Sequence, residues 1–175
     1  MLIIFYVANV QYKMDWKQIL IGGLALGLGI ALYVFDRPPA QTYFLPDAMS
    51  LFTTTRSVFG RLGNHLPTFL HVFAFCLISS GMLGRSRRGA LIVCFFWLFV
   101  DAVFEIGQHP SVSEIIIPMI PSVFFDIPVL ENTASYFAQG RFDPMDLMSI
   151  LLGAVCAYVL IQVMFRKEMH TLSHS

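Results

Sequence analysis

The sequence predicts an all-α integral membrane protein, a bundle of four transmembrane helices with interfacial or re-entrant segments in its outer loops. Of its 175 residues, 57% are hydrophobic and 13% are charged, and the mean hydropathy is +0.70, more apolar than a soluble domain with a solvated surface. Four windows approach the roughly 20 apolar residues needed to cross ~30 Å of hydrocarbon. They are residues 18–35, 65–83, 89–107 and 146–165. We expect one domain over residues 1–175.

The first predicted span is preceded by an apolar run over residues 1–12. That run is too short to span and lacks the basic flank of a signal peptide, and Met14 is an alternative start. Within the span, small residues recur four apart on two faces, which permits close approach of another helix. These pairs are Gly23 with Gly27 and Ala25 with Gly29. Packing within the chain and a homodimer face both fit the pattern, and we favour packing within the chain.

Small residues also recur along the last span, at Ser149, Gly153 and Ala157. We therefore expect this helix to pack closely against the first helix or the third. The three cysteines, Cys76, Cys94 and Cys156, all fall within spans and form no CxxC pair. They are predicted to be packing residues, because neither a disulfide framework nor a zinc ribbon fits their positions.

Two longer loops, 37–64 and 108–142, are predicted on the outer side. Near-helical apolar spacing over 47–62 indicates a helix lying in the outer interface. The apolar stretch 115–130 contains Pro118, Pro121 and Pro128, which remove backbone donors that lipid cannot replace. We expect this stretch to lie in the interface or to re-enter the membrane.

The distribution of Lys and Arg predicts the orientation of the chain. One side carries Lys13, Lys17, Arg85, Arg87, Arg88, Arg166 and Lys167, and the other carries Arg37, Arg56, Arg61 and Arg141. The larger set is expected in the cytoplasm, with both termini. The net charge of zero gives no reason to expect nucleic-acid binding.

Two acids stand inside the third predicted span, Asp101 and Glu105, with Gln108 at its outer end. A charge at the bilayer centre costs about 2.5–3.5 kcal/mol on insertion scales, so an acid there marks a candidate functional site. Glu105 is expected roughly 5 Å, and Asp101 roughly 10 Å, below the outer boundary. His71, on the second span, is expected at roughly 9 Å.

A histidine and carboxylates at one level can form a proton-transfer pair or an ion pair. Hydrogen bonds that merely hold the helices together need the same residues. The sequence leaves both readings of His71, Asp101 and Glu105 open. We expect Glu105 to face Arg141 and Asp146, and Asp101 to be a partner for His71 or an inter-helix hydrogen bond.

A second polar group precedes the last span, at Arg141, Asp143 and Asp146. Asp143 is expected at the N-cap, Pro144 at the first helical position and Asp146 two residues later, where a carboxylate suits the helix dipole. Arg141, with Arg56 and Arg61 nearby, could hold a lipid phosphate at the headgroup level. A salt bridge from Arg141 to Glu105, Glu131 or Asp143 is the alternative.

No cofactor and no metal are expected. His65, His71, His109 and the acids offer ligand types, but these three histidines are not related by a ligand spacing such as HxxxH that would support a metal site. GxSxG and SxxK nucleophile motifs and a glycine-rich phosphate loop are absent from the sequence.

Three segments together resemble a known pattern: Phe69–Phe75 around His71, then Glu105-Ile106-Gly107-Gln108, then Gly140-Arg141-Phe142-Asp143-Pro144-Met145-Asp146 with Gly153. This ordered combination is similar to the VanZ-like family of small bacterial membrane proteins. The resemblance covers roughly residues 67–157 and implies a helical membrane protein of the cell envelope, linked to reduced susceptibility to teicoplanin-type glycopeptides. It implies no established reaction. The motif positions are His71, Glu105, Gln108, Arg141, Asp143 and Asp146.

Three functions follow as hypotheses. The leading one is a membrane protein with an outward-facing polar cavity that binds an amphiphile, an anionic or undecaprenyl-type lipid. The cavity would be lined by His71, Asp101, Glu105, Gln108, Arg141, Asp143 and Asp146. The second is a non-catalytic subunit of a larger membrane complex or a homo-oligomer. The third is an enzyme acting on lipid-linked phosphate or glycan, with His71 and the carboxylates as acid and base.

Overall fold

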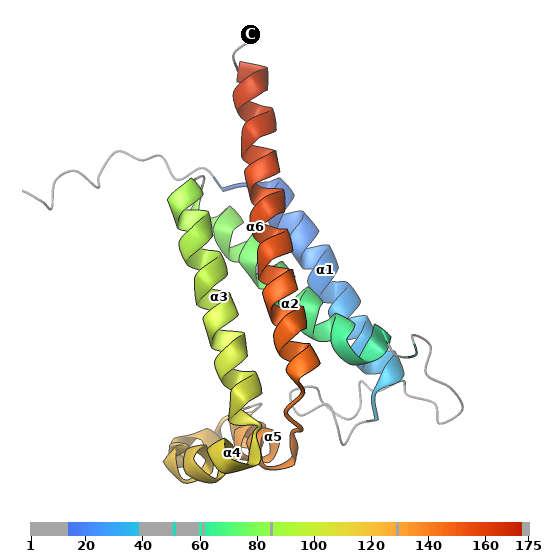
Figure 1. The fold of residues 1–175 in the computed structure, drawn as a ribbon, viewed down its shortest axis with the longest axis vertical. Coiled ribbons are helices and arrows are strands. Elements are labelled where there is room, and N and C mark those ends of the chain that lie inside the picture. The colour runs from blue at the N-terminus through green and yellow to red at the C-terminus, as the bar shows by residue number, and fades with distance from the viewer. Residues whose placement is uncertain are drawn as a thin grey trace, which may run out of the picture.

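The computed structural model describes residues 14–38, 51, 60, 62–84, 86–128 and 130–172. These residues form an all-α bundle, as predicted (Figure 1). Its four long helices are α1 (Trp16–Asp36), α2 (Leu62–Leu83), α3 (Arg87–Gly107) and α6 (Pro144–Leu172). Each predicted span lies inside one of them, and all four are long and apolar enough to cross a membrane. The chain is therefore a multi-span membrane protein.

The ends of the long helices are set by local side chains. Asp15 caps α1 by accepting hydrogen bonds from the backbone N–H groups of Lys17 and Gln18. Gly84 has a φ of 83° directly after α2, a left-handed conformation that glycine adopts without strain. Ser86 then caps α3 through the N–H of Gly89.

Helix α2 is the centre of the bundle, because it packs against α1, α3 and α6, and α6 also packs against α3. The buried core is mostly aliphatic, with two cysteines and one phenylalanine. Its members are Val72, Cys76, Leu77, Ala90, Cys94, Ile150, Ala154, Ala157, Ile161 and Phe165. Cys76 and Cys94 are packing residues as predicted, whereas Cys156 is exposed on the outer face of α6, so the prediction was wrong there.

Glycines allow two of these helix contacts to be close. A Cβ added at Gly22 of α1 would lie 2.9 Å from the carbonyl oxygen of Ala74, and one added at Gly153 of α6 would lie 2.7 Å from that of Phe69. The last helix therefore packs through its small residues against α2, and not against α1 as one of our expectations had it. On α1, Gly29 faces α2, but a Cβ at Gly23 or Gly27 would have nothing within 4 Å.

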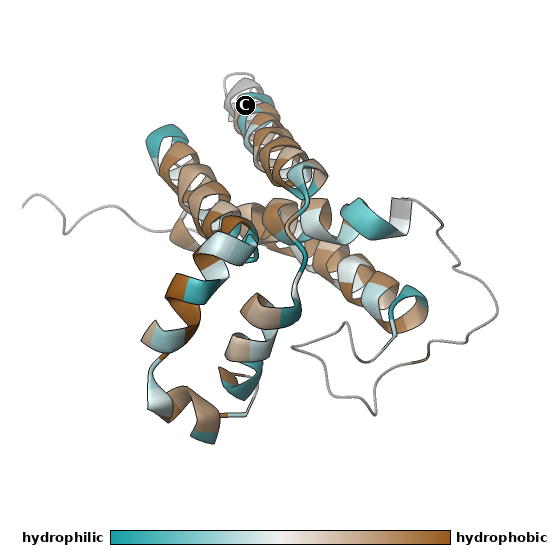
Figure 2. Ribbon diagram, turned by 60° about the horizontal axis from the view of Figure 1, so that its bottom comes forward, coloured by the Kyte–Doolittle hydropathy of each residue, from teal (hydrophilic) through white to brown (hydrophobic). Residues whose placement is uncertain are grey.

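Large apolar side chains cover the outside of the long helices, as a lipid-facing surface requires. On α3, Ile92, Phe95, Phe96 and Phe99 are between 55% and 68% exposed. Figure 2 shows the long helices mostly hydrophobic, with hydrophilic residues gathered towards their ends.

The segment after α3 forms short helices and no span. These are α4 (Pro110–Ile116), η4 (Ile117–Met119), η5 (Ser122–Asp126), η6 (Leu130–Asn132) and α5 (Thr133–Gln139). They lie at the end of α3 (Figure 1), where the ring of Phe137 stacks on Phe104 at 5.7 Å. A Cβ at Gly107 would meet that ring at 2.5 Å. The predicted interfacial helix over 47–62 lies almost wholly outside the described residues.

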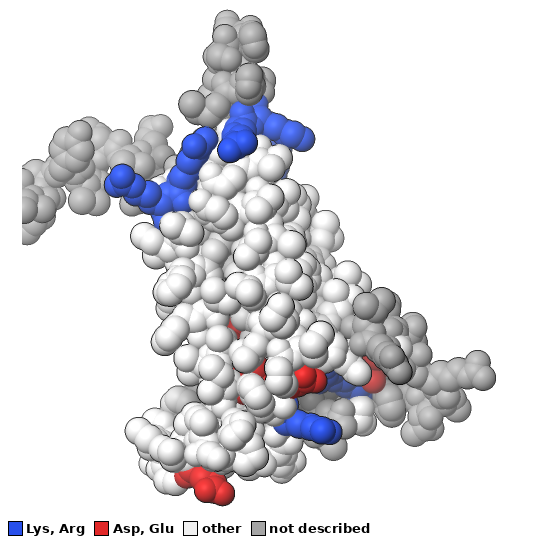
Figure 3. Space-filling model, viewed as in Figure 1, with Lys and Arg blue, Asp and Glu red and all other residues white. Residues whose placement is uncertain are grey.

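Charged residues are distributed unequally between the two ends of the bundle (Figure 3). Lys17, Arg87, Arg88, Arg166 and Lys167 belong to the end where α1 and α3 begin and α6 finishes. Apart from Asp15 and Glu168, the described acids belong to α3 beyond its midpoint, to the outer segment or to the neighbouring helix ends, together with Arg37 and Arg141. Arg56 and Arg61 lie outside the described residues.

Candidate functional site

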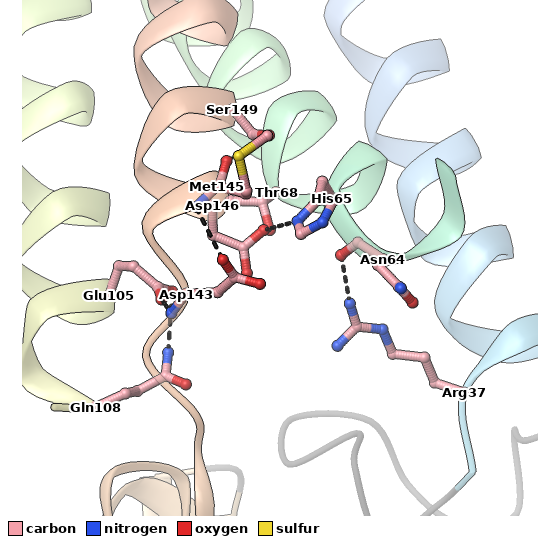
Figure 4. A network of polar contacts seen from close by, with 10 residues as sticks. All are labelled: Arg37, Asn64, His65, Thr68, Glu105, Gln108, Asp143, Met145, Asp146 and Ser149. Atoms are coloured by element: carbon pink, nitrogen blue, oxygen red, sulfur yellow. Dashed lines mark hydrogen bonds and ion pairs between the residues drawn. The ribbon is translucent and has the colours of Figure 1, made fainter. Parts of the chain in front are cut away.

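A polar cavity of about 490 Å³ opens at the acidic end of the bundle. It is built from helix ends that are remote in sequence: the end of α1, the first turn of α2 and the start of α6 with the residues before it (Figure 4). The lining residues are Asp36, Arg37, Asn64, His65, Arg141, Phe142, Asp143, Pro144 and Asp146. Three of the predicted site residues, Arg141, Asp143 and Asp146, therefore lie on its wall.

The start of α6 follows the capping arrangement predicted from the sequence. The Asp143 carboxylate accepts the backbone N–H of Met145 at 2.9 Å, and the Asp143 carbonyl accepts that of Asp146 at 2.9 Å. Pro144 is the first residue of the helix, where its missing N–H costs nothing. These contacts fix Asp143 and Asp146 within one helical turn at the cavity wall.

Asp146 is held from the side of α2. Its Oδ1 lies 2.9 Å from Nδ1 of His65 and accepts a longer bond of 3.4 Å from the hydroxyl of Thr68. Figure 4 shows the His65 and Asp146 side chains pointing towards each other across the space between the two helices. One ring nitrogen of His65 and one oxygen each of Asp143 and Asp146 all lie within 4.8 Å of one another.

Glu105 is hydrogen-bonded to the main chain that forms this wall of the cavity. The side chain is 6% exposed, and its Oε1 accepts the backbone N–H of Asp143 at 2.7 Å. The other oxygen accepts the amide of Gln108 at 3.3 Å. The Glu105 carboxylate thus binds the main chain immediately before α6, and among the described residues it makes no hydrogen bond or ion pair with the Arg141 or Asp146 side chain. Its burial is offset by a short bond of the kind that charged acceptors make.

Gln108 joins α3 to the outer segment. Its amide also donates a 2.6 Å hydrogen bond to the hydroxyl of Tyr136 on α5. Burial, assisted by the nearby charge of Glu105, raises the pKa of Tyr136, so its hydroxyl stays protonated at physiological pH. Gly140 is required beside this pair, because a Cβ there would collide with the Gln108 carboxamide.

His71 and Asp101 form a separate pair, in which Nδ1 and Oδ1 lie 2.9 Å apart. The predicted partnership between them is confirmed. Neither residue lies on the wall of the cavity, so the predicted single centre is divided into two in the described structure. The reason is angular: six residues separate His65 from His71, about one and two-thirds turns, and their side chains leave α2 in different directions.

The two arginines of the cavity differ in how they are held. The Arg37 guanidinium donates to the carbonyl of Asn64 at 2.8 Å and lies 4.8 Å from the ring centre of Tyr33. Arg141 is exposed and makes no hydrogen bond or ion pair with any residue that the structure describes. The predicted salt bridge to Glu105, Glu131 or Asp143 is therefore absent from that part of the chain.

Sequence reasoning did not assign Asp36, Arg37, Asn64, His65 or Tyr136 to this site, and it named His65 only as a residue of a metal-ligand type. Arg37, Asn64 and His65 stand at the outer ends of the first two spans, and ranking every polar residue by depth would have placed them with Arg141. Tyr136 carries no such signal, because it lies in a short helix whose position depends on packing against the end of α3.

No family model, curated protein or solved structure matches this chain. The class that the fold defines is a multi-span helical membrane protein.

Proposed function

We propose that the protein binds the phosphate-bearing headgroup of a membrane lipid in the polar cavity. The supporting observation is the Arg141 guanidinium, exposed on the cavity wall without a partner among the described residues, in the same cavity as Arg37. A guanidinium presents a planar set of donors that matches two phosphate oxygens. Arg37 keeps further donors for such a ligand, since the structure assigns only its NH2 nitrogen to Asn64.

The depth of the cavity fits a headgroup. Helices α1 and α3 each have 21 residues, a length of about 31 Å that matches the ~30 Å hydrocarbon core. Arg37 directly follows α1 and Gln108 directly follows α3. A bundle that spans the hydrocarbon core would therefore have this end at the level of lipid phosphates. The excess of Lys and Arg at the other end favours an outward-facing cavity in a bacterial inner membrane, with both termini in the cytoplasm.

The ligand class that we propose is an anionic phospholipid or an undecaprenyl-type lipid phosphate. Both carry the phosphate chemistry that Arg141 and Arg37 recognise. The resemblance to the VanZ-like family favours the second source and predicts an effect on teicoplanin-type susceptibility. That resemblance stays a prediction.

The proposal is tested by thermal unfolding of the purified chain in detergent with added lipid. Phosphatidylglycerol and undecaprenyl phosphate are the probes, and diacylglycerol, which lacks phosphate, is the blank. We expect one of the phosphate lipids to raise the unfolding temperature, and Arg141→Ala to weaken its apparent affinity about tenfold, the typical loss for a charge-assisted hydrogen bond. The two lipids distinguish the two sources of phosphate.

Arg88→Ala is the matched control, because Arg88 is an exposed arginine at the opposite end of the bundle. It should leave the lipid response unchanged. Equal responses of wild-type protein and Arg141→Ala to every phosphate lipid, or an equal response to diacylglycerol, would overturn the proposal.

A second function, a subunit of a membrane complex or homo-oligomer, is favoured by one observation. The His71 side chain is 47% exposed within the span of α2 although it is paired with Asp101. Polar groups within a membrane normally face protein or water, so a neighbouring helix would cover this pair. Purification of the tagged protein with a stoichiometric partner, or as a dimer, would support this function; a monomer without partners would argue against it. The enzyme hypothesis stays a prediction.

A further inference from the structure

We propose that His65, Asp143 and Asp146 form a binding site for one divalent transition-metal ion of the Zn²⁺ type. The three residues come from two places in the chain, the first turn of α2 and the start of α6 with the residue before it. One potential ligand atom from each lies within 4.8 Å of the other two, and the shortest separation, from Nδ1 of His65 to Oδ1 of Asp146, is 2.9 Å.

This spacing is close to that of a coordination sphere. Ligands bound to one zinc ion at about 2.0–2.2 Å lie roughly 3.0–3.5 Å from each other. The Asp146 and His65 atoms, 2.9 Å apart, lie close to that range, and the three ligand atoms, now within 4.8 Å of one another, would move together to complete the set.

The three side chains are positioned by surrounding contacts. The main chain at Asp143 is bonded to Glu105, and the Thr68 hydroxyl donates to the Asp146 carboxylate. Helices α2 and α6 are held in close contact through Gly153. Partners of this kind orient metal ligands and raise affinity. The proposed metal site would thus be formed by helix ends whose positions the fold determines.

The carboxylates of the cavity are a second, independent argument for a bound cation. The cavity contains three carboxylates, Asp36, Asp143 and Asp146, against two guanidinium groups. Among the described residues neither Asp143 nor Asp146 has an ion pair with Lys or Arg, and they lie three residues apart on one turn. Asp143 and Asp146 would repel a phosphate beside them, and a divalent cation between these acids and the phosphate removes that repulsion.

The donor set indicates the class of metal. One imidazole nitrogen with two carboxylates suits Zn²⁺, with Mn²⁺ as the next choice, better than Mg²⁺ or Ca²⁺, which prefer oxygen ligands alone. Three protein ligands leave at least one coordination position open, and here it faces the cavity that contains Arg141. Coordination of a lipid phosphate at that position rests on the proposed function; binding of the metal does not.

The test is metal binding by the full chain in detergent, after treatment with a chelator and without added lipid. Equilibrium dialysis against Zn²⁺ should give one ion per chain. His65→Ala and Asp146→Asn should each weaken binding at least tenfold. The matched controls are His109→Ala and Asp126→Asn, an exposed histidine and an exposed acid outside the cavity, which should bind as wild type does.

A measurement on unaltered protein guards against variants that fail to fold. Co²⁺ in place of Zn²⁺ should give an absorption spectrum typical of nitrogen and oxygen ligands, and Zn²⁺ should displace it. Less than one bound ion per chain in the wild type, or binding that His65→Ala and Asp146→Asn leave unchanged, would overturn the metal site. Lipid binding that depends on Arg141 but persists with chelator would overturn the metal's part in it while sparing the proposed function.

Discussion

At the scale of single residues, the His71–Asp101 pair poses the clearest question. The two side chains lie within the spans and bond to each other, while the second carboxylate oxygen of Asp101 is buried without a described partner. An inter-helix bond that only holds α2 to α3 and a polar centre with its own function use the same geometry. Exchange of both residues for apolar ones separates the two roles.

We predict that His71→Phe lowers the free energy of unfolding by roughly 1–3 kcal/mol, because it leaves the Asp101 carboxylate without its partner. The double variant His71→Phe/Asp101→Leu should recover most of that loss, since neither polar group then remains to be desolvated. Equilibrium unfolding in mixed micelles measures both values. A double variant whose loss of unfolding free energy equals the sum of the losses of His71→Phe and Asp101→Leu, each measured alone, would contradict the pairing.

Among the site residues, those governed by local chemistry were predictable. The capping roles of Asp143 and Pro144 follow from three consecutive positions, and the structure confirms them. The depth of Asp101 and His71 follows from helical rise alone, which is why their pairing was predicted correctly. The hydrogen bond between the Asp143 backbone N–H and Glu105 joins residues that are 38 positions apart, and no local sequence pattern predicts it.

At the scale of helices, the contact between α2 and α6 depends on one small residue. Gly153 brings the α6 backbone against the carbonyl of Phe69, one turn beyond His65 on the same helix. The relative placement of His65 and Asp146 follows from this contact, because both residues lie at the ends of the packed helices. Loss of the close approach therefore affects the cavity as well as the core.

We predict that Gly153→Ala destabilises the protein by about 1–3 kcal/mol, as overpacking of a tight contact does. Gly23→Ala is the matched control: Gly23 is also inside a spanning helix, but its new Cβ meets nothing within 4 Å. It should be neutral or slightly stabilising, because alanine is the better helix former. Thermal unfolding compares the two. Equal losses would show that the cost comes from the helix backbone and not from the contact.

The long helices were predictable because membrane thickness sets a length that the sequence displays directly. The short helices of the outer segment were not, since seven-residue helices such as α4 and α5 have little stability of their own and depend on contacts with the end of α3. The sequence also did not show which glycines of α1 pack against another helix. Gly22 and Gly29 face α2, while Gly23 and Gly27, which are spaced four residues apart, do not.

At the scale of the whole molecule, the unequal charge of the two ends bears on insertion. Basic residues next to spans resist translocation, so the end with Arg87 and Arg88 is expected to stay in the cytoplasm. Four spans then return the chain to the side from which it started. The cavity faces away from the cytoplasm in this orientation.

We predict that a fluorescent protein fused after α6 is bright in a bacterial host, and that alkaline phosphatase fused there is inactive, since it needs an oxidising compartment. Phosphatase inserted at Val123, in the exposed outer segment, should be active. The opposite pattern at both positions would invert the proposed orientation. Substitution of Arg87 and Arg88 by Ala should lower the fraction of chains with the predicted pattern.

For the site as a whole, the sequence predicts the depth of each residue along its helix. It does not predict the direction in which each side chain leaves that helix. Helical rise places Arg37, His65 and Arg141 near one level, whereas helix packing decides which of them share a cavity. Without the angles between helices, the sequence could not show that His71 leaves α2 towards α3 while His65 turns towards α6.

The hydrogen bond from the Asp143 backbone to Glu105 also has a consequence for how the chain can vary in length. It fixes the point where the outer segment returns to the bundle, at a residue 38 positions after Glu105 in the last turn of α3. Once both ends are pinned, doubling the length between them costs only about 0.6 kcal/mol of closure entropy. The outer segment can therefore accept insertions or deletions around η5 without displacing the residues at the start of α6, so it is the natural place to append a tag or to evolve a new loop.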